Sequence, residues 1–150
     1  MSIRDRVAEF HQKFGQPILP VPGVPDDDRV RMRPRLITEE VFEVLGAIFP
    51  RADWSRLRAE VAYKIDHEEV DVDLVNLAHE LADLAYVVEG TNLEIGVDGE
   101  AVGVEVHRAN MSKLGPDGRP VLRADGKVQK GPHYAPPDIA RVLREQGWNR

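Results

Sequence analysis

Helical periodicity over residues 71–95 constrains the fold of this chain more than any other feature of its sequence. The apolar residues of this stretch recur at intervals of three and four, namely Leu74, Leu77, Leu81, Leu84 and Val88. At about 100° per residue they fall within one arc of a helix, and Gly96 favours a helix end directly afterwards. A long helix with one apolar side requires other helices to cover that side, so the pattern predicts a helical bundle.

Further helices are predicted from the same spacing and from end signals. They cover residues 3–14, 28–49, 54–65 and 98–112, with a short final helix over 138–147. Asp53 and Asp98 are the expected N-caps of two of them, and Pro34 either kinks the second helix or marks its true start. Residues 115–138 are rich in turn signals, and "ADGK" within them indicates a small hairpin. We therefore expect one all-α domain over residues 1–150, a four- to five-helix bundle with an irregular C-terminal tail.

Composition excludes several classes of protein. The hydrophobic content of 42% is sufficient for a core, and the chain has no cysteine, which removes disulfide frameworks and thiolate zinc sites. No apolar run approaches the roughly 18 to 20 residues of a membrane span, and the charged N-terminal stretch lacks the apolar core of a signal peptide. We expect a soluble, cytoplasmic protein that does not associate with membranes.

Charge is distributed unevenly along the chain. The net charge is −6, but residues 1–106 hold 11 Lys and Arg against 22 Asp and Glu, whereas residues 107–150 hold 9 against 4. An acidic body argues against non-specific nucleic-acid binding, which requires a basic face. A basic tail on an acidic body suits a small polyanion that is bound through metal ions.

Carboxylates occupy positions where apolar residues are expected. Glu80 and Asp83 fall one turn apart, on the border of the apolar arc of the 71–95 helix. In the 28–49 helix, "EEVFE" places Glu40 and Glu43 inside the apolar stripe. Buried carboxylates must be protonated, paired or bound to metal, so we expect the two pairs to share a cation. Arginines such as Arg33 or Arg108 could neutralise them instead.

The donor atoms indicate which cation this would be. Carboxylates without cysteine, and without Glu-x-x-His, make a hard oxygen site suited to Mg²⁺ or Mn²⁺. Mg²⁺ is usually shared with phosphate oxygens, which points to a phosphate-bearing substrate. "HELAD" also resembles the metalloprotease pattern HExxH with Asp83 as the changed ligand, but that alternative leaves "EEVFE" without a role and offers no third ligand.

The carboxylate motifs and the tail carry a family resemblance. "EEVFE" followed by "ELAD" resembles the ExxE and ExxD signature of the MazG-like all-α NTP pyrophosphohydrolases, which include dimeric dUTPases, dCTPases and phosphoribosyl-ATP pyrophosphohydrolases. "VHRANMSKLGPDGRPVLRADGKVQKGPHYAPPDI" is similar to the tail of bacterial and phage members. The resemblance covers about residues 5–145 and is weakest over 50–70. It implies a bundle of the all-α NTP pyrophosphatase type.

The resemblance also implies an activity and a metal site. The activity is hydrolysis of a nucleoside triphosphate to a monophosphate and pyrophosphate, with a pyrimidine deoxynucleotide, dUTP first, as the expected substrate. The implied Mg²⁺ ligands are Glu40, Glu43, Glu80 and Asp83. Glu39 is the candidate for orienting or deprotonating the attacking water, although Glu40 could serve with Glu39 as a further ligand.

The remaining expectations concern the substrate-binding residues, the oligomeric state and the alternative functions. Asn110 and Lys113 match family residues that contact the nucleotide phosphates, and Arg108 is grouped with them as substrate-binding. His11 and Gln16 could read a nucleobase, or could simply end a helix that packs into the core. The resemblance implies a homodimer or homotetramer. The alternatives are a phosphoribosyl-ATP pyrophosphohydrolase-like enzyme, and a non-catalytic helical module whose acidic clusters bind a basic partner.

Overall fold

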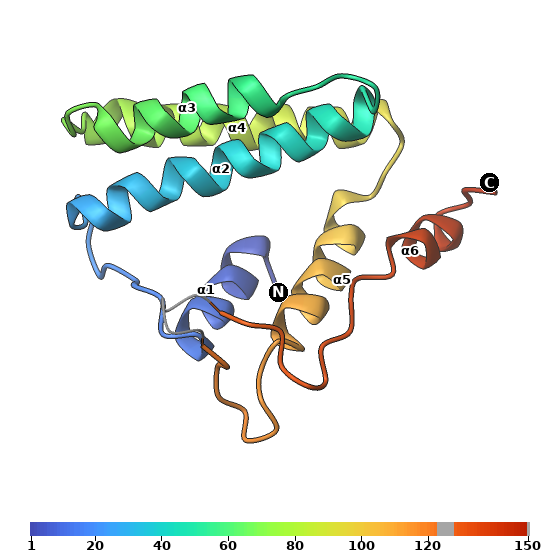
Figure 1. Ribbon diagram of the computed structural model, residues 1–150. Coiled ribbons are helices and arrows are strands. Elements are labelled where there is room, and N and C mark those ends of the chain that lie inside the picture. The colour runs from blue at the N-terminus through green and yellow to red at the C-terminus, as the bar shows by residue number, and fades with distance from the viewer. Residues whose placement is uncertain (123–127, 150) are drawn as a thin grey trace. The chain divides into compact units, whose positions relative to one another are not determined.

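The computed structural model describes residues 1–122 and 128–149 (Figure 1). Within them it contains six α-helices, which are α1 (Ile3–Lys13), α2 (Asp27–Ile48), α3 (Ser55–His67), α4 (Leu74–Glu94), α5 (Gly99–Met111) and α6 (Ile139–Glu145). The only β-type pairing among these residues consists of two isolated antiparallel bridges. The predicted all-α fold is confirmed, and its C-terminal tail is irregular up to α6.

Side-chain caps set most of the helix starts. Asp26 caps α2 by accepting a 2.9 Å hydrogen bond from the backbone N–H of Arg29, so α2 begins at Asp27 and passes through Pro34. The alternative that Pro34 starts this helix is therefore wrong. Asp98 caps α5 as predicted, since its Oδ1 accepts from the backbone N–H of Ala101. Asp53 lies one residue before the N-cap of α3, which is Trp54.

The tail contains antiparallel pairing on either side of the predicted turn. Bridges pair Leu114 with Pro120 and Leu122 with Val128, and the backbone N–H of Gln129 donates to the carbonyl of Val121 at 2.7 Å. The whole of the expected hairpin turn "ADGK", residues 124–127, falls in residues 123–127, which lie outside the described part of the chain. The pairing on both sides of that gap is antiparallel, as a hairpin requires.

Contacts divide the chain into two compact units. The first unit is Met1–Pro20 with Leu81–Arg150, and the second is Val21–Glu80. The boundary falls inside α4, whose end is set by Gly96 at a φ of 71°, the left-handed conformation that glycine adopts without steric cost. Each unit is described by itself.

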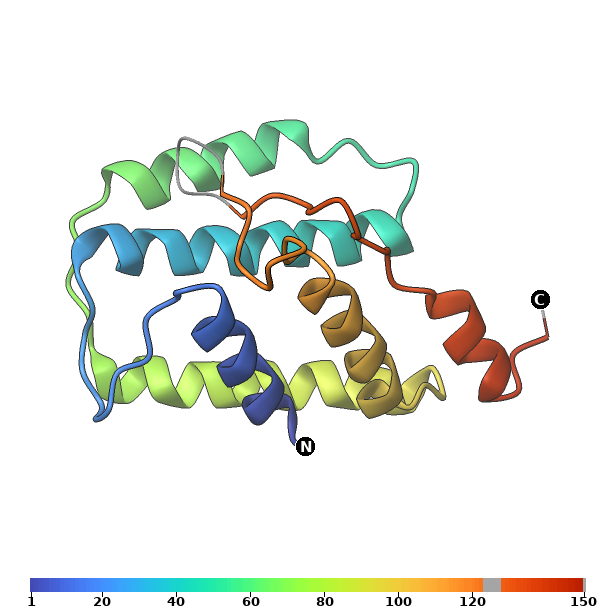
Figure 2. The same cartoon turned by 90° about the horizontal axis from the view of Figure 1, so that it is seen from below.

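In the first unit, α5 packs against both α1 and α6 (Figure 2). Its buried hydrophobic side chains are Phe14, Ala109 and Val142, and Phe10 stacks on Phe14 with ring centroids 4.1 Å apart. Arg6 is buried with them because its guanidinium reaches α5. This unit therefore combines a small apolar core with a buried cation.

In the second unit, α2 packs against α3 (Figure 1). Phe42 is its buried hydrophobic side chain, with the Trp54 ring 6.5 Å away and the Arg58 guanidinium 5.2 Å above the Phe42 ring. Arg31 on α2 donates to the carbonyls of Ile65 and Glu68 at 2.6 and 2.9 Å. These bonds satisfy carbonyls that the end of α3 leaves without helical partners.

Much apolar surface remains exposed. Only four hydrophobic residues of the described chain are buried, and α4 contributes none of them. Of the predicted α4 arc, Leu77, Leu81 and Val88 are 43%, 45% and 54% exposed. The helix and its periodicity were predicted correctly, but its apolar side is not covered. No helix of the described residues has the length and apolar character needed to cross a membrane.

Candidate functional site

The α2 carboxylates lie in the second half of that helix. Glu39, Glu40 and Glu43 are all exposed, and so are the neighbouring apolar side chains Val41 and Val44, at 43% and 55%. The expectation that Glu40 and Glu43 are buried is therefore wrong. The pattern did place them in the apolar stripe, but α2 buries only Phe42, so the rest of that stripe stays in solvent.

The α4 carboxylates are also exposed. Glu80 and Asp83 are one helical turn apart, which places them on the same side of α4. The boundary between the two units falls between them, so Glu80 belongs with Glu40 and Glu43 and Asp83 belongs to the other unit. Exposure leaves these carboxylates accessible to a cation from solvent.

No preformed metal cluster is present in the described chain. Groups of three or more histidine, cysteine, aspartate or glutamate side chains close enough to hold a metal ion are absent there. The donors nevertheless fit the predicted ion, because each pair offers two carboxylates at i and i+3 and Mg²⁺ prefers oxygen ligands. The shared metal site stays a prediction.

Asn110 and Lys113 are brought together at the end of α5. The Lys113 Nζ donates to the Asn110 Oδ1 at 2.7 Å, and both residues are half-buried. The pair thus presents an ammonium charge and an amide within one turn. That combination can bind a polyanion, with the amide fixing the direction of the lysine side chain.

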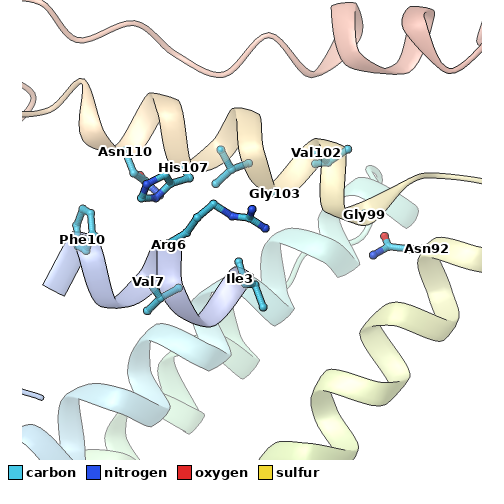
Figure 3. Close-up of a pocket in the computed structure, with 11 residues that line it drawn as sticks. Ile3, Arg6, Val7, Phe10, Asn92, Gly99, Val102, Gly103, His107 and Asn110 are labelled. Carbon is cyan, nitrogen blue, oxygen red and sulfur yellow. The ribbon is translucent and has the colours of Figure 1, made fainter. Parts of the chain in front are cut away.

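Asn110 also lines a pocket between α1 and α5, of about 300 Å³ (Figure 3). Phe10, Val7 and Ile3 form its α1 side, whereas Val102, Gly103, Val106 and His107 form much of its α5 side. Arg6 extends between the two helices in Figure 3. The volume reaches the lower end of the range for small-molecule sites, and apolar walls with a few polar groups are typical of them.

His11 and Gln16 lie at the end of α1 and just after it. The His11 Nδ1 is 2.9 Å from the carbonyl oxygen of Pro17, and the Gln16 Nε2 donates to the carbonyl of Phe14 at 3.2 Å. Neither residue is among the described residues that line the α1–α5 pocket. The structure therefore places them near Phe14, and their role in reading a base is not tested by it.

Arg108 is held by protein groups. Its Nε and Nη2 donate to the Glu105 carboxylate at 3.0 and 2.7 Å, and its Nη2 also donates to the carbonyl of Pro136 at 2.9 Å. Sequence reasoning grouped Arg108 with the substrate contacts and missed Glu105. The i, i+3 spacing of the two residues is the only local signal of this pair, because the other donors to Glu105 come from the far end of the chain.

Two comparisons with known proteins agree with this fold. A family model described as phosphoribosyl-ATP pyrophosphohydrolase matches residues 7–110. A crystal structure assigned to an NTP pyrophosphohydrolase from Exiguobacterium sp. 255-15 is 28% identical, with a TM-score of 0.71, and the match covers 98% of this chain and 97% of that one. No curated protein sequence matches the chain. The family match spans both carboxylate motifs and Asn110.

Proposed function

Because the chain belongs to the phosphoribosyl-ATP pyrophosphohydrolase family, we propose that it hydrolyses a nucleoside triphosphate between the α and β phosphates, giving a monophosphate and pyrophosphate. The observation that carries this proposal is the presence of two accessible carboxylate pairs at i and i+3 on two long helices, both inside the matched region. The 28% identical protein assigned as an NTP pyrophosphohydrolase supports the same general activity.

The metal requirement of this reaction is proposed from the donor set. Glu40, Glu43, Glu80 and Asp83 would hold Mg²⁺, or Mn²⁺, through carboxylate oxygens. The bound ions would supply charge neutralisation of the triphosphate and a more acidic water. Four carboxylates at one site would repel one another without metal, so the site would depend on the bound ions.

Glu39 is proposed to act on the attacking water. It lies directly beside Glu40 in the sequence and is exposed, so it can accept a proton or orient a water molecule without leaving a buried charge. Glu40 could take this role instead, with Glu39 as a ligand. Negative charge develops on the leaving pyrophosphate during bond cleavage, and the metal ions held by the carboxylates would neutralise it.

The substrate is proposed to bind at the end of α5. Lys113 and Asn110 would contact phosphate or ribose oxygens, and the α1–α5 pocket that Asn110 lines would take the sugar or base. His11 and Gln16 remain the proposed readers of the base edge. We place dUTP first, dCTP or a damaged nucleotide second, and phosphoribosyl-ATP third. Phosphoribosyl-ATP has independent support, because the matching family model is described as phosphoribosyl-ATP pyrophosphohydrolase.

Assembly into a homodimer or homotetramer is part of the proposal. Only four hydrophobic residues of the described chain are buried, whereas Val75, Tyr86 and Leu93 on α4 are 84%, 83% and 73% exposed. Apolar surface of this kind is usually covered by a partner, and a second copy would give an isologous interface. A fully active monomer at micromolar concentration would contradict this. We place the enzyme in the cytoplasm, where nucleotides are available.

The deciding experiment is pyrophosphate release from a panel of nucleoside triphosphates and phosphoribosyl-ATP, with Mg²⁺, with Mn²⁺ and with EDTA. We expect turnover with either metal ion and none with EDTA. If no member of the panel is hydrolysed, the result would favour the rival view, in which the acidic helices bind a basic partner and no metal is needed.

A further inference from the structure

Glu105 is the residue at which the C-terminal segment meets α5. It is 5% exposed, and its two carboxylate oxygens accept four hydrogen bonds. Two come from Arg108 on the same helix, one from the backbone N–H of Asp138 at 2.8 Å and one from the Arg141 Nη2 at 3.2 Å. A carboxylate with this many donors stays charged, and these contacts hold the pKa of Glu105 at about 2.

The donors to Glu105 also fix the start of α6. Asp138 is the N-cap of α6, with its Oδ1 accepting from the backbone N–H of Arg141 at 2.9 Å. The Arg141 Nη1 pairs with Glu145 at 2.7 Å. Glu105 therefore joins α5 to both the backbone and a side chain of the first turn of α6.

The segment before α6 is attached to the last turn of α5. The Arg108 Nη2 donates to the carbonyl of Pro136 at 2.9 Å, and the backbone N–H of Ala135 donates to the Ser112 Oγ at 3.0 Å. The backbone N–H of Gly131 donates to the carbonyl of Lys113 at 3.1 Å. Residues 131–141 thus follow α5 from Lys113 back to Glu105.

At the Lys113 end of this segment, Gly131 lies so close to the backbone of Lys113 and Leu114 that no side chain would fit there. It is buried, and a Cβ at this position would lie 2.5 Å from the carbonyl oxygen of Leu114 and 2.8 Å from that of Lys113. These distances are too short for any side chain. The backbone of residue 131 therefore lies directly against the residue whose ammonium group pairs with Asn110.

We propose that Glu105 is a positioning residue, which holds residues 131–141 against α5 and thereby fixes the Asn110–Lys113 pair that binds the triphosphate. The proposal rests on the proposed function for the identity of the ligand. The proposal also assigns a role to Arg108. Its guanidinium bonds both to Glu105 and to the carbonyl of Pro136, so Arg108 would help to hold residues 131–141 against α5. In this role Glu105 would act without contacting the substrate, since its carboxylate is buried among protein donors.

The first test is Glu105→Gln, with Glu145→Gln as the matched control. Both changes remove a carboxylate that pairs with Arg141, but Glu145 is exposed and contacts neither Asp138 nor Arg108 in the described structure. For Glu105→Gln we expect KM for the best triphosphate to rise about 10-fold, the scale of one lost charged hydrogen bond, with kcat changed much less. Glu145→Gln should match the wild type. Equal KM values in all three proteins would overturn the proposal.

A double-mutant cycle separates positioning from a general loss of structure. If Glu105 acts through Lys113, Glu105→Gln should add little to the KM of Lys113→Ala, whereas a general structural defect would give multiplicative effects. Gly131→Ala provides a second variant in case Glu105→Gln does not fold. It should raise KM in the same way by displacing the tail at the Lys113 end.

A measurement without substrate keeps this proposal separate from the proposed function. Trace acetylation followed by mass spectrometry compares the reactivity of Lys113 with that of Lys64, which pairs with Glu68 in the other unit. Glu105→Gln should raise the ratio of Lys113 to Lys64 labelling several-fold, and Glu145→Gln should not. An unchanged ratio overturns the positioning role even in an active enzyme, and a raised ratio supports it even if no triphosphate is hydrolysed.

Discussion

The Arg6 Nη2 donates to the Glu100 Oε2 at 2.6 Å, which ties a guanidinium on α1 that is only 3% exposed to the first turn of α5. The Arg6 Nη1 also donates to the carbonyl of Met1 at 2.6 Å. The pKa of Arg6 is raised, chiefly by the hydrogen bond to Glu100. Arg6 therefore connects the N-terminus, α1 and α5.

Arg6→Ala should loosen α1 from α5. It removes both hydrogen bonds and leaves Glu100 without its partner, and it also removes the packing of the arginine stem. We expect a lower urea midpoint of unfolding, with greater hydrogen exchange in α1. Arg4→Ala is the control, since Arg4 lies on the same helix but is exposed. Similar midpoints for the two variants would contradict the importance of the pair.

Phe42→Ala should destabilise the second unit selectively. Phe42 is the buried hydrophobic residue of α2, and removing a buried phenylalanine usually costs about 3 kcal/mol. The Trp54 ring lies 6.5 Å from Phe42, so Trp54 fluorescence should report the loss. Phe49→Ala is the matched control, because Phe49 is 52% exposed at the same distance from Trp54. Its effect should stay below about 1 kcal/mol.

Stability should depend on the charge of Glu105 in acid. Arg108 and the backbone N–H of Asp138 lower the pKa of this carboxyl from 4.5 to about 2. Its contribution to stability is therefore complete above pH 4.5 and is lost as the pH falls from 4.5 toward 2. Glu105→Gln should be less stable than the wild type at neutral pH, and the difference should shrink through that window. A difference that does not change with pH in urea titrations would contradict the assignment.

The proposed metal ligands should be needed for activity and not for folding. Glu43→Gln and Asp83→Asn should each lower kcat/KM at least about 100-fold, because each removes a ligand that supports transition-state charge. The fold should be intact or more stable, since each change also removes carboxylate repulsion. Glu94→Gln, another exposed acid on α4, is the control and should keep full activity. Retained activity in both ligand variants would refute the site.

The enzyme should distinguish between nucleoside triphosphates by their sugar and base, because all of them share the triphosphate. A pocket that packs apolar atoms where the ribose 2′-hydroxyl would lie leaves that hydroxyl unpaired, which favours deoxyribose about 5- to 150-fold. Comparing kcat/KM for dUTP, UTP, dCTP and dTTP measures this. Equal values for UTP and dUTP would remove the deoxyribose preference, and faster hydrolysis of purine nucleotides would remove the pyrimidine one.

Local signals predicted the helices well because the caps are local. Asp98 and Gly96 mark their helix ends as expected. Pro34 was harder to interpret, since the Asp26 cap starts α2 before it and the helix continues through it to Ile48, despite the lost hydrogen bond and the crowding of the Val30 carbonyl that an interior proline causes. Helix type and approximate length thus followed from residues within a few positions of each end.

Burial and the Glu105 contacts could not be predicted in the same way. Periodicity shows which side of α2 is apolar, but it cannot show that α2 covers only Phe42 and leaves Glu40 and Glu43 in solvent. The Glu105 contacts depend on donors 33 and 36 residues further along the chain, at Asp138 and Arg141. Such contacts are decided by how the tail returns to α5, which no local pattern specifies.

The small amount of apolar burial has a calorimetric consequence. Exposure of apolar surface on unfolding is the main source of the positive heat-capacity increment, typically about 12–15 cal/mol/K per residue in globular proteins. Only four hydrophobic residues of the described chain are buried, so an isolated chain would have little apolar surface left to expose. Its unfolding would show a small increment and a broad, shallow stability curve. Chains that cover one another's α4 would unfold with a larger increment and a more strongly curved dependence of stability on temperature.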